Sequence, residues 1–407
     1  MTTLVVAGAS LAGVQAAQVV RREGFDGRLV LIGDEPHQPY DRPPLSKEYL
    51  TAEEADEDRI KLRATADPDA LDIDWRLGRR AVSLDQGAST ITLDDGEELA
   101  WDGLVIATGA RPRRLPGQRA DDGSARPGIL ELRTLDDARQ LRAHIDGGAT
   151  SLVVCGAGFI GAEVAASARQ RGLDVTLLDA APVPMDRVLD QAAGEAVADL
   201  HRANGVDVRL GVKVTEFSQG PDGSAVVVLD DGTEIVSDAV VVGIGVVPNT
   251  DWLADTSLDI DDGFLTDATT LAAPGIVAAG DVARWPNARF DGRLMRVEQW
   301  DNAIDMGGHA ARRLLAELDG ADGATYAPVP WFWSDQYDRK IQLAGLVGPT
   351  VEVVQGSIEE ARFVQIYGDD EGRCCGALCW NRPRQAIQAR QLIAEGESLD
   401  TARERLG

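Results

Sequence analysis

The chain has 407 residues, of which 40 are Lys or Arg and 67 are Asp or Glu, so its formal net charge is −27. This length excludes a small disulfide-stapled scaffold, and the charge argues against a nucleic acid or an anionic membrane face as partner. Three of the four cysteines lie within residues 374–379, which excludes a secreted disulfide framework and favours a reducing cytoplasm. Because glycine, serine and glutamine interrupt the apolar N-terminus, we expect no signal peptide and no membrane-spanning segment.

The first 35 residues have the pattern of a strand, a glycine-rich turn, an alanine-rich helix and a second strand. This pattern is typical of the opening βαβ unit of a dinucleotide-binding fold. The turn carries Gly8, Ser10 and Gly13, and serine at the middle position is small enough for a pyrophosphate to approach. Asp34 or Glu35, at the end of the second strand, is expected to hold a ribose, and Asp34 aligns by position.

The same pattern recurs at residues 151–179, where Gly156, Gly158 and Gly161 form an intact G-x-G-x-x-G between a strand and a helix. These glycines allow a tight turn, a close approach of backbone N–H groups to a pyrophosphate and close packing of the helix on the strand. Asp179 ends the next strand at the spacing expected for a ribose-binding carboxylate. The duplication predicts two nucleotide-binding domains.

Two further apolar strands, at 104–112 and 239–249, each run into a glycine turn, where we expect the chain to cross between the two domains. From about Tyr326 the sequence changes to Trp-rich strands followed by terminal helices. We therefore predict an α/β protein with two Rossmann-like dinucleotide-binding domains and a C-terminal α+β domain. The predicted boundaries are 1–110 with 243–325 for the first domain, 111–242 for the second and 326–407 for the third.

Residues 269–283 contain a strand that is expected to deliver Asp281 to the N-terminus of a following helix. A carboxylate at that position is either an ordinary N-cap or a ligand for the ribityl chain and hydroxyls of a cofactor.

The two glycine turns, together with ATGARP, GIGVVPN and AAGD, resemble the two-dinucleotide-binding-domain flavoproteins. Within that superfamily, DRPPLSKEYL (41–50), ELRTLDDA (131–138), RVEQWDNA (296–303) and PWFWSDQYDRKIQ (330–342) are similar to the NADH-dependent ferredoxin reductases of oxygenase systems. The resemblance covers nearly the whole chain. It implies FAD in the first domain, NADH in the second, a [2Fe–2S] ferredoxin as electron acceptor, and a cytoplasmic monomer or weak homodimer.

The resemblance also implies residue roles. Carried over by position, the residues that line FAD are Ala12, Asp34, Lys47, Ala81, Arg133, Asp281 and Trp300. The predicted cofactor-binding set is completed by the two glycine turns with their acids and by eight further residues. These are Glu35, Arg42, Ala107, Thr108, Gly109, Ile160, Gly245 and Gly280.

Three residues are expected to act in catalysis. Lys47, one of only four lysines, follows two prolines, and its charge is expected to stabilise the anionic reduced flavin. Glu163 lies in the first turn of the second fingerprint helix, where the helix dipole alone would favour it; alternatively it pairs with Lys47 or contacts the nicotinamide amide. Trp333 is expected near the flavin on the side that faces the partner, with core packing as the alternative.

No metal site is predicted, because an iron–sulfur centre needs four ligands and Cys155 lies in the nucleotide fingerprint. The iron–sulfur partner is therefore expected to be another protein. Residues 284–296 carry four arginines against one aspartate and are either a ferredoxin-docking patch or unrelated surface arginines. We also expect NADH to be preferred over NADPH, because Asp179 would meet the 2′-phosphate and residues 180–186 hold no Arg or Lys.

Three alternatives stay open. A rubredoxin reductase and an NADH oxidase share this fold. An NADH-binding interaction protein resembling apoptosis-inducing factor would need a basic surface to bind DNA, which the charge of −27 opposes. A disulfide reductase is disfavoured because residues 1–150 contain no cysteine.

Overall fold

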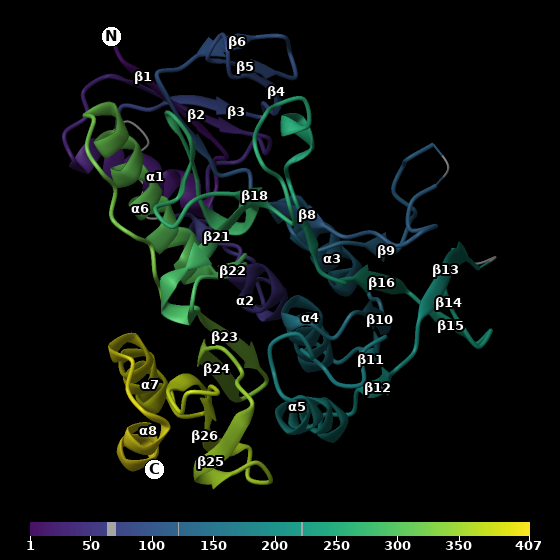
Figure 1. The fold of residues 1–407 in the computed structure, drawn as a ribbon. Coiled ribbons are helices and arrows are strands. Elements are labelled where there is room, and N and C mark those ends of the chain that lie inside the picture. The colour runs from purple at the N-terminus through teal and green to yellow at the C-terminus, as the bar shows by residue number, and fades with distance from the viewer. Residues whose placement is uncertain (63–70, 121, 221–222) are drawn as a thin grey trace. The chain divides into compact units, whose positions relative to one another are not determined.

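The computed structural model of the chain describes residues 1–62, 71–120, 122–220 and 223–407 (Figure 1). The chain divides into two compact units, each made of three separate stretches. The first unit comprises Met1–Asp41, Glu57–Arg111 and Val247–Phe332, and the second comprises Arg42–Asp56, Pro112–Val246 and Trp333–Gly407.

A mainly parallel sheet forms the centre of the first unit. Its strand order is β19 (Leu271–Ala273), β20 (Ile276–Ala278), β7 (Gly103–Ile106), β1 (Thr3–Ala7), β2 (Arg28–Gly33) and β3 (Asp74–Leu77). Apart from Thr3, the central strands β1 and β7 are apolar, as expected for strands whose two faces are both covered. The order reverses at β1, which is the point where ligands bind in open α/β sheets.

Helices α1 (Leu11–Arg22) and α6 (Trp300–Leu318) lie side by side against this sheet (Figure 1). A glycine makes their close packing possible, since a Cβ atom on Gly307 would lie 2.4 Å from the Ala12 carbonyl oxygen.

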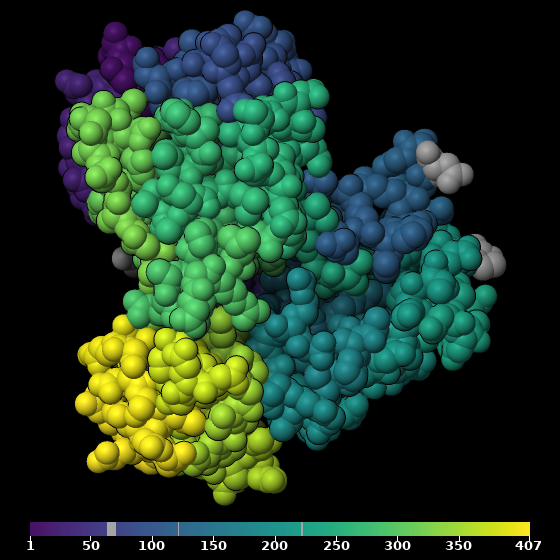
Figure 2. Space-filling model, viewed as in Figure 1, coloured from purple at the N-terminus to yellow at the C-terminus, as the bar shows by residue number. Residues whose placement is uncertain are grey.

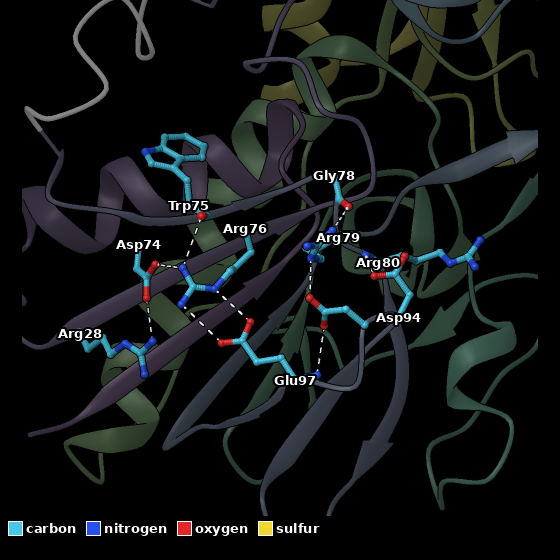
Figure 3. Close-up of polar contacts among 10 residues, drawn as sticks. Arg28, Asp74, Trp75, Arg76, Gly78, Arg79, Arg80, Asp94 and Glu97 are labelled. Atoms are coloured by element: carbon cyan, nitrogen blue, oxygen red, sulfur yellow. Dashed lines mark hydrogen bonds and ion pairs between the residues drawn. The ribbon is translucent and has the colours of Figure 1, made fainter.

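Two small sheets complete the first unit. They are β4 (Ala81–Asp85), β5 (Thr90–Leu93) and β6 (Glu98–Ala100), and β18 (Phe264–Leu265), β21 (Ala283–Asn287) and β22 (Arg293–Met295). Ion pairs join the β5–β6 hairpin to the edge strand β3, with Arg76 Nε 3.2 Å from a Glu97 oxygen (Figure 3). Arg79, just after β3, pairs with Asp95 of the same hairpin at 2.6 Å. These charges cover the open edge of the parallel sheet.

The second unit repeats the nucleotide-binding architecture. Its parallel sheet has the order β12 (Asp207–Leu210), β11 (Asp174–Asp179), β10 (Ser151–Cys155), β16 (Ala239–Val242) and β9 (Ile129–Leu130). Its helices are α2 (Glu48–Thr51), α3 (Leu135–Asp146), α4 (Phe159–Gln170) and α5 (Gln191–Ala203). An antiparallel sheet follows, with strands β13 (Val214–Gln219), β14 (Ala225–Leu229) and β15 (Glu234–Ser237). Strands β8 (Ala110–Pro112) and β17 (Val246–Pro248) form a separate pair.

The C-terminal part of the chain is an antiparallel sheet with the order β23 (Trp331–Gln336), β24 (Arg339–Gly345), β27 (Cys374–Trp380), β26 (Arg362–Gly368) and β25 (Thr350–Ser357). Helices α7 (Pro383–Glu395) and α8 (Leu399–Leu406) pack on it, and together they form the yellow-green and yellow body in Figure 2. The predicted fold class, two Rossmann-like halves and a C-terminal α+β part, is confirmed. Within the described residues, no helix combines the length and apolar character needed to cross a bilayer.

Candidate functional site

The first glycine turn joins β1 to α1. Gly8 has a φ of +128°, and a Cβ atom there would lie 2.0 Å from the Ala107 carbonyl oxygen. A Cβ atom on Gly13 would lie 1.8 Å from the Gly8 carbonyl oxygen. Both positions therefore require glycine, because any side chain would collide with backbone.

The second glycine turn, between β10 and α4, has the same geometry. Gly156 has a φ of +104°, and a Cβ atom on it would lie 2.3 Å from the Gly243 carbonyl oxygen. A Cβ atom on Gly161 would lie 1.8 Å from the Gly156 carbonyl oxygen. At Gly158, by contrast, a Cβ atom would meet no atom within 4 Å. This open middle position explains how the first turn accommodates serine at the equivalent place.

The N-cap residues of helices α1 and α4 are Ser10 and Gly158. The Ser10 side chain makes no capping hydrogen bond, and glycine has no side chain that could make one. In contrast, Thr134 and Asp190 cap α3 and α5 with side-chain hydrogen bonds. The first-turn N–H groups of a helix need acceptors, and phosphate oxygens suit them and the helix dipole. The two glycine turns therefore fit two dinucleotide pyrophosphates.

The acids at the ends of the second strands lie in different surroundings. Asp179 accepts hydrogen bonds from the backbone N–H of Ala157, at 2.5 Å, and of Ala181, at 2.8 Å, so its carboxylate lies against the second glycine turn. In the first unit Asp34 is exposed, whereas Glu35 accepts a 2.5 Å hydrogen bond from the Tyr40 hydroxyl.

Lys47 and Glu163 are brought together. The Lys47 ammonium lies 2.6 Å from one Glu163 oxygen, and the Glu163 side chain is 3% exposed. Ser46 donates to that same oxygen at 2.6 Å, and Ser334 of β23 donates to the other oxygen at 2.8 Å. Of the readings left open for Glu163, the structure therefore shows the ion pair with Lys47.

The segment that carries Lys47 is fixed to α3 and α4. Arg142 donates to the Tyr49 carbonyl oxygen at 2.7 Å, and Arg171 donates to that of Leu50 at 2.6 Å. Ser167 donates to the Ser46 carbonyl oxygen at 2.7 Å. These hydrogen bonds explain why Arg42–Asp56 belongs to the second unit, although it lies early in the sequence.

Two other predicted residues are joined in the second unit, since Arg42 donates to the Arg133 carbonyl oxygen. Ile160, in the first turn of α4, is 40% exposed. Gly245 has a φ of +99° and follows β16. Trp333 is half-buried on β23, whose burial alternates from residue to residue, so Trp331 and Trp333 share one face as expected.

The remaining predicted residues lie in the first unit. Ala107, Thr108 and Gly109 follow β7, and the Thr108 hydroxyl donates to the Asn249 carbonyl oxygen at 2.9 Å. Ala12 is buried in α1, and a Cβ atom on Gly280 would lie 3.0 Å from its methyl group.

Three more first-unit residues complete the predicted set. Ala81 opens β4, and Trp300 opens α6 and donates to Asp41 at 2.8 Å. Asp281 lies in the first turn of a helix, as expected, but this helix is only a three-residue 3₁₀ helix, Gly280–Val282, which leads into strand β21. Its N-cap residue is Ala279, so Asp281 is not an N-cap.

The four cysteines offer no reactive dithiol to the nucleotide sites. Cys155 is buried in the core below the second glycine turn, and burial raises its pKa to about 12. Cys374, Cys375 and Cys379 all lie on β27, and burial raises the pKa of each. Among the described side chains, no group of three His, Cys, Asp or Glu residues is arranged to hold a metal ion.

Sequence reasoning missed Ser46, Ser334, Gln336 and His201, all buried polar residues. Ser46 and Ser334 lie inside the motifs PPLSK and WFWSDQY, and both are hydrogen-bonded to Glu163. Because successive side chains of a strand point to opposite faces, Ser334 and Gln336 share one face of β23, but nothing local in the sequence indicates that this face is buried.

The comparisons with known proteins agree with this geometry. Residues 2–307 match the family described as pyridine nucleotide-disulphide oxidoreductase, and residues 331–405 match the reductase C-terminal domain. Rhodocoxin reductase of Rhodococcus erythropolis is 40% identical over 395 residues, which cover 96% of this chain and 89% of that protein. The ferredoxin–NAD(+) reductase component of the p-cumate 2,3-dioxygenase system of Pseudomonas putida is 39% identical, over 99% of this chain and 96% of that one.

Among solved structures, the chain is similar to the covalent putidaredoxin reductase–putidaredoxin complex, with a TM-score of 0.90 and 32% identity. The match covers 100% of this chain and 98% of that one. The chain therefore belongs to the pyridine nucleotide-disulphide oxidoreductase family and is an oxidoreductase that carries the reductase C-terminal domain.

Proposed function

We propose that this protein is an NADH-dependent ferredoxin reductase, which passes electrons from NADH through FAD to a [2Fe–2S] ferredoxin that serves an oxygenase. The observation that carries the proposal is the pair of uncapped glycine-turn helices, α1 and α4, in a chain that also holds the buried Lys47–Glu163 ion pair. Several relatives are named as ferredoxin–NAD(+) reductase components of dioxygenase systems, which supports this acceptor.

FAD and NAD(H) are the cofactors implied by family membership. We assign FAD to residues 1–110 and 243–325, where the turn at Gly8 and Gly13 would hold the pyrophosphate and Asp34 or Glu35 the ribose. We assign NADH to residues 111–242, where the turn at Gly156 and Gly161 and the carboxylate of Asp179 would play these parts. Residues 326–407 form the third domain.

FAD, when bound, accepts two electrons from NADH as a hydride and passes them on singly to a one-electron carrier. Lys47 supplies a positive charge that favours added negative charge at the flavin. Glu163 holds that ammonium in place, since the ion pair is buried and the carboxylate accepts three hydrogen bonds. A buried charge that is paired and hydrogen-bonded in this way keeps a fixed position without reorganisation during the reaction.

The expected docking patch for ferredoxin is smaller than the sequence indicates. Arg284 pairs with Asp261 at 2.6 Å, and the side chain of Arg296 is 6% exposed and pairs with Asp262 at 3.3 Å. We keep Arg289 and Arg293, around β22, as the candidate docking residues. Arg293 is exposed, whereas Arg289 is half-buried and donates to the Ala327 carbonyl oxygen. We assign the ferredoxin contact to these two arginines and expect a cytoplasmic monomer or weak homodimer.

A turnover assay with three acceptors tests the proposal against its alternatives. NADH oxidation is followed with a [2Fe–2S] ferredoxin, with rubredoxin and with oxygen alone. Fast turnover with ferredoxin supports the proposal, and fast turnover with rubredoxin indicates a rubredoxin reductase. NADH oxidation that is as fast with oxygen alone as with the protein acceptors indicates an NADH oxidase. Slow turnover with all three would favour an NADH-binding interaction protein.

The cofactor assignment has its own test. We expect one noncovalent FAD per chain, because no His or Cys in the sequence has an evident tethering context. Acid precipitation should release the flavin into the supernatant, and flavin that stays with the precipitate would contradict the assignment.

A further inference from the structure

A line of hydrogen bonds extends from Glu163 into the interior of the second unit. Ser334 donates to Glu163 Oε1 at 2.8 Å, and Gln336 Nε2 donates to the Ser334 hydroxyl oxygen at 3.1 Å. His201 Nε2 lies 3.0 Å from Gln336 Oε1, and His201 Nδ1 lies 3.1 Å from the Tyr337 hydroxyl. Thus β23 and α5 both contribute to the surroundings of the Lys47–Glu163 pair.

The hydrogen bonds in this line all run in one direction. Because Gln336 uses its amide nitrogen toward Ser334, its oxygen faces His201, which must then donate from Nε2. His201 Nδ1 is left as the acceptor for the Tyr337 hydroxyl. Burial lowers the pKa of His201 to about 4 and raises that of Tyr337, so both hold these protonation states at neutral pH. Each donor therefore points along the line toward Glu163.

This line is buried. Ser334, Gln336 and His201 are each 0% exposed. Buried polar groups are costly unless hydrogen-bonded, and each of these three side chains has its partners within the line. The line ends on the buried Glu163 carboxylate, which also accepts a hydrogen bond from the Lys47 ammonium. The aligned donors of the line therefore act on the position and charge of this ion pair.

We propose that Ser334 is a positioning residue for the Lys47–Glu163 pair, and that Gln336 and His201 fix the direction in which its hydroxyl donates. The proposal deepens the proposed function and rests on it, since it assumes that Lys47 acts at the flavin. The amide of Gln336 interrupts proton transfer along the line, so we assign the line an orienting role and no role as a proton path.

The first test compares Ser334→Ala with Ser334→Thr, which restores the hydroxyl, and with Ser357→Ala, a matched control at the end of β25 outside this line. The limiting rate of flavin reduction by NADH and the apparent Kd for NADH are measured by anaerobic stopped-flow, and the flavin midpoint potential by dye equilibration. We expect the limiting rate to fall about tenfold in Ser334→Ala, on the scale of one hydrogen bond to a charged group. The Kd should change by less than about twofold, because the lost hydroxyl acts on Lys47 and not on the nucleotide turn. The midpoint potential should fall.

Ser334→Thr should recover most of the rate, and Ser357→Ala should match the unaltered protein. Gln336→Met, a substitution of similar size, should give a smaller loss in the same direction, and it keeps the test open if Ser334→Ala folds poorly. The proposal would be overturned if Ser334→Ala and Gln336→Met both showed the same limiting rate and the same midpoint potential as the control Ser357→Ala. Equal losses in Ser334→Ala and Ser334→Thr would also overturn it, because they would indicate packing.

The small number of lysines allows a second readout that does not depend on turnover. The holoprotein is labelled with ¹⁵N-lysine, and the ammonium signals of its four lysines are recorded. Lys47, whose side chain is 14% exposed, should give a slowly exchanging signal, unlike Lys61 at 52% and Lys340 at 44%. Ser334→Ala should speed the exchange of the Lys47 signal, and an unchanged signal would overturn the proposal. If this signal changes while Lys47→Met leaves flavin reduction unchanged, the positioning role stands and the proposed role of Lys47 at the flavin fails.

Discussion

Replacing Asp179 with Asn should relax the preference for NADH over NADPH. The carboxylate ends β11 and is held by the N–H groups of Ala157 and Ala181, so its charge lies beside the second glycine turn. A 2′-phosphate at this place would meet that charge. Asparagine keeps the shape and one acceptor oxygen but removes the negative charge.

The magnitude follows from the charge and its surroundings. Two unit charges about 4 Å apart repel by about 1 kcal/mol in water and about 4 kcal/mol at a protein surface. Asp179 is partly exposed, so we take about 2–3 kcal/mol, which corresponds to a preference of roughly 30–150-fold in kcat/KM.

The next basic residue after Asp179 in the sequence, Arg187, does not offset this repulsion. Arg187 lies beside Gly245, with its Nη1 atom 3.6 Å from where a Cβ atom would be. Gly245 follows β16, and β16 and β11 lie on opposite sides of β10. The guanidinium is therefore on the far side of the central strand from Asp179.

The assay compares kcat/KM for NADH and NADPH with ferricyanide as acceptor. Asp174→Asn is the matched control, because Asp174 begins the same strand and its side chain is 93% exposed. We expect Asp179→Asn to lose most of the preference and Asp174→Asn to keep it within about twofold. Equal use of both cofactors by the unaltered protein, or an unchanged ratio in Asp179→Asn, would refute the assignment of Asp179.

Three further predictions follow from the site and its surroundings. Lys47→Met should slow the limiting rate of flavin reduction more than it weakens NADH binding, and an unchanged stopped-flow rate would assign Lys47 a structural role only. Exchange of both Arg289 and Arg293 for Glu should raise the KM for ferredoxin and alter its salt dependence, while ferricyanide reduction falls far less; a parallel loss of both activities would contradict docking there. The pKa of His201 is lowered from 6.5 to about 4 by burial, so the unfolded chain binds this proton first and stability falls as the pH drops from 6.5 to 4, by about 3 kcal/mol at most. His201→Asn should therefore show a smaller decrease in thermal midpoint between pH 7 and pH 4.5 than the unaltered protein, and an equal decrease would contradict the buried neutral state.

The local part of the fold could be predicted from the sequence. The glycine turns could be recognised because Gly13 and Gly161 are required by the carbonyl oxygens of Gly8 and Gly156, which belong to the same βαβ units. The strands that precede the two turns are also apolar on both faces. The alternation in β23 likewise indicated a strand with Trp331 and Trp333 on one face.

The parts that depend on distant contacts could not be predicted. Nothing in residues 42–56 indicates that Arg142 and Arg171 hold this segment to α3 and α4. The partner of Arg284, Asp261, lies 23 residues earlier in the chain, so the sequence overstated the free positive charge in this region. Ser334 and Glu163 are 171 residues apart, and only the packing of β23 brings them together.

The central claim is that this chain moves electrons from NADH to a ferredoxin through bound flavin. The most direct test is an anaerobic reaction of catalytic amounts of the purified, FAD-loaded protein with NADH and an excess of a [2Fe–2S] ferredoxin, followed at the absorbance of the iron–sulfur centre. We expect the ferredoxin to be reduced over many turnovers, with about two ferredoxin molecules reduced for each NADH oxidised. Flavin that NADH reduces fully, but that then leaves [2Fe–2S] ferredoxins oxidised, would contradict the claim.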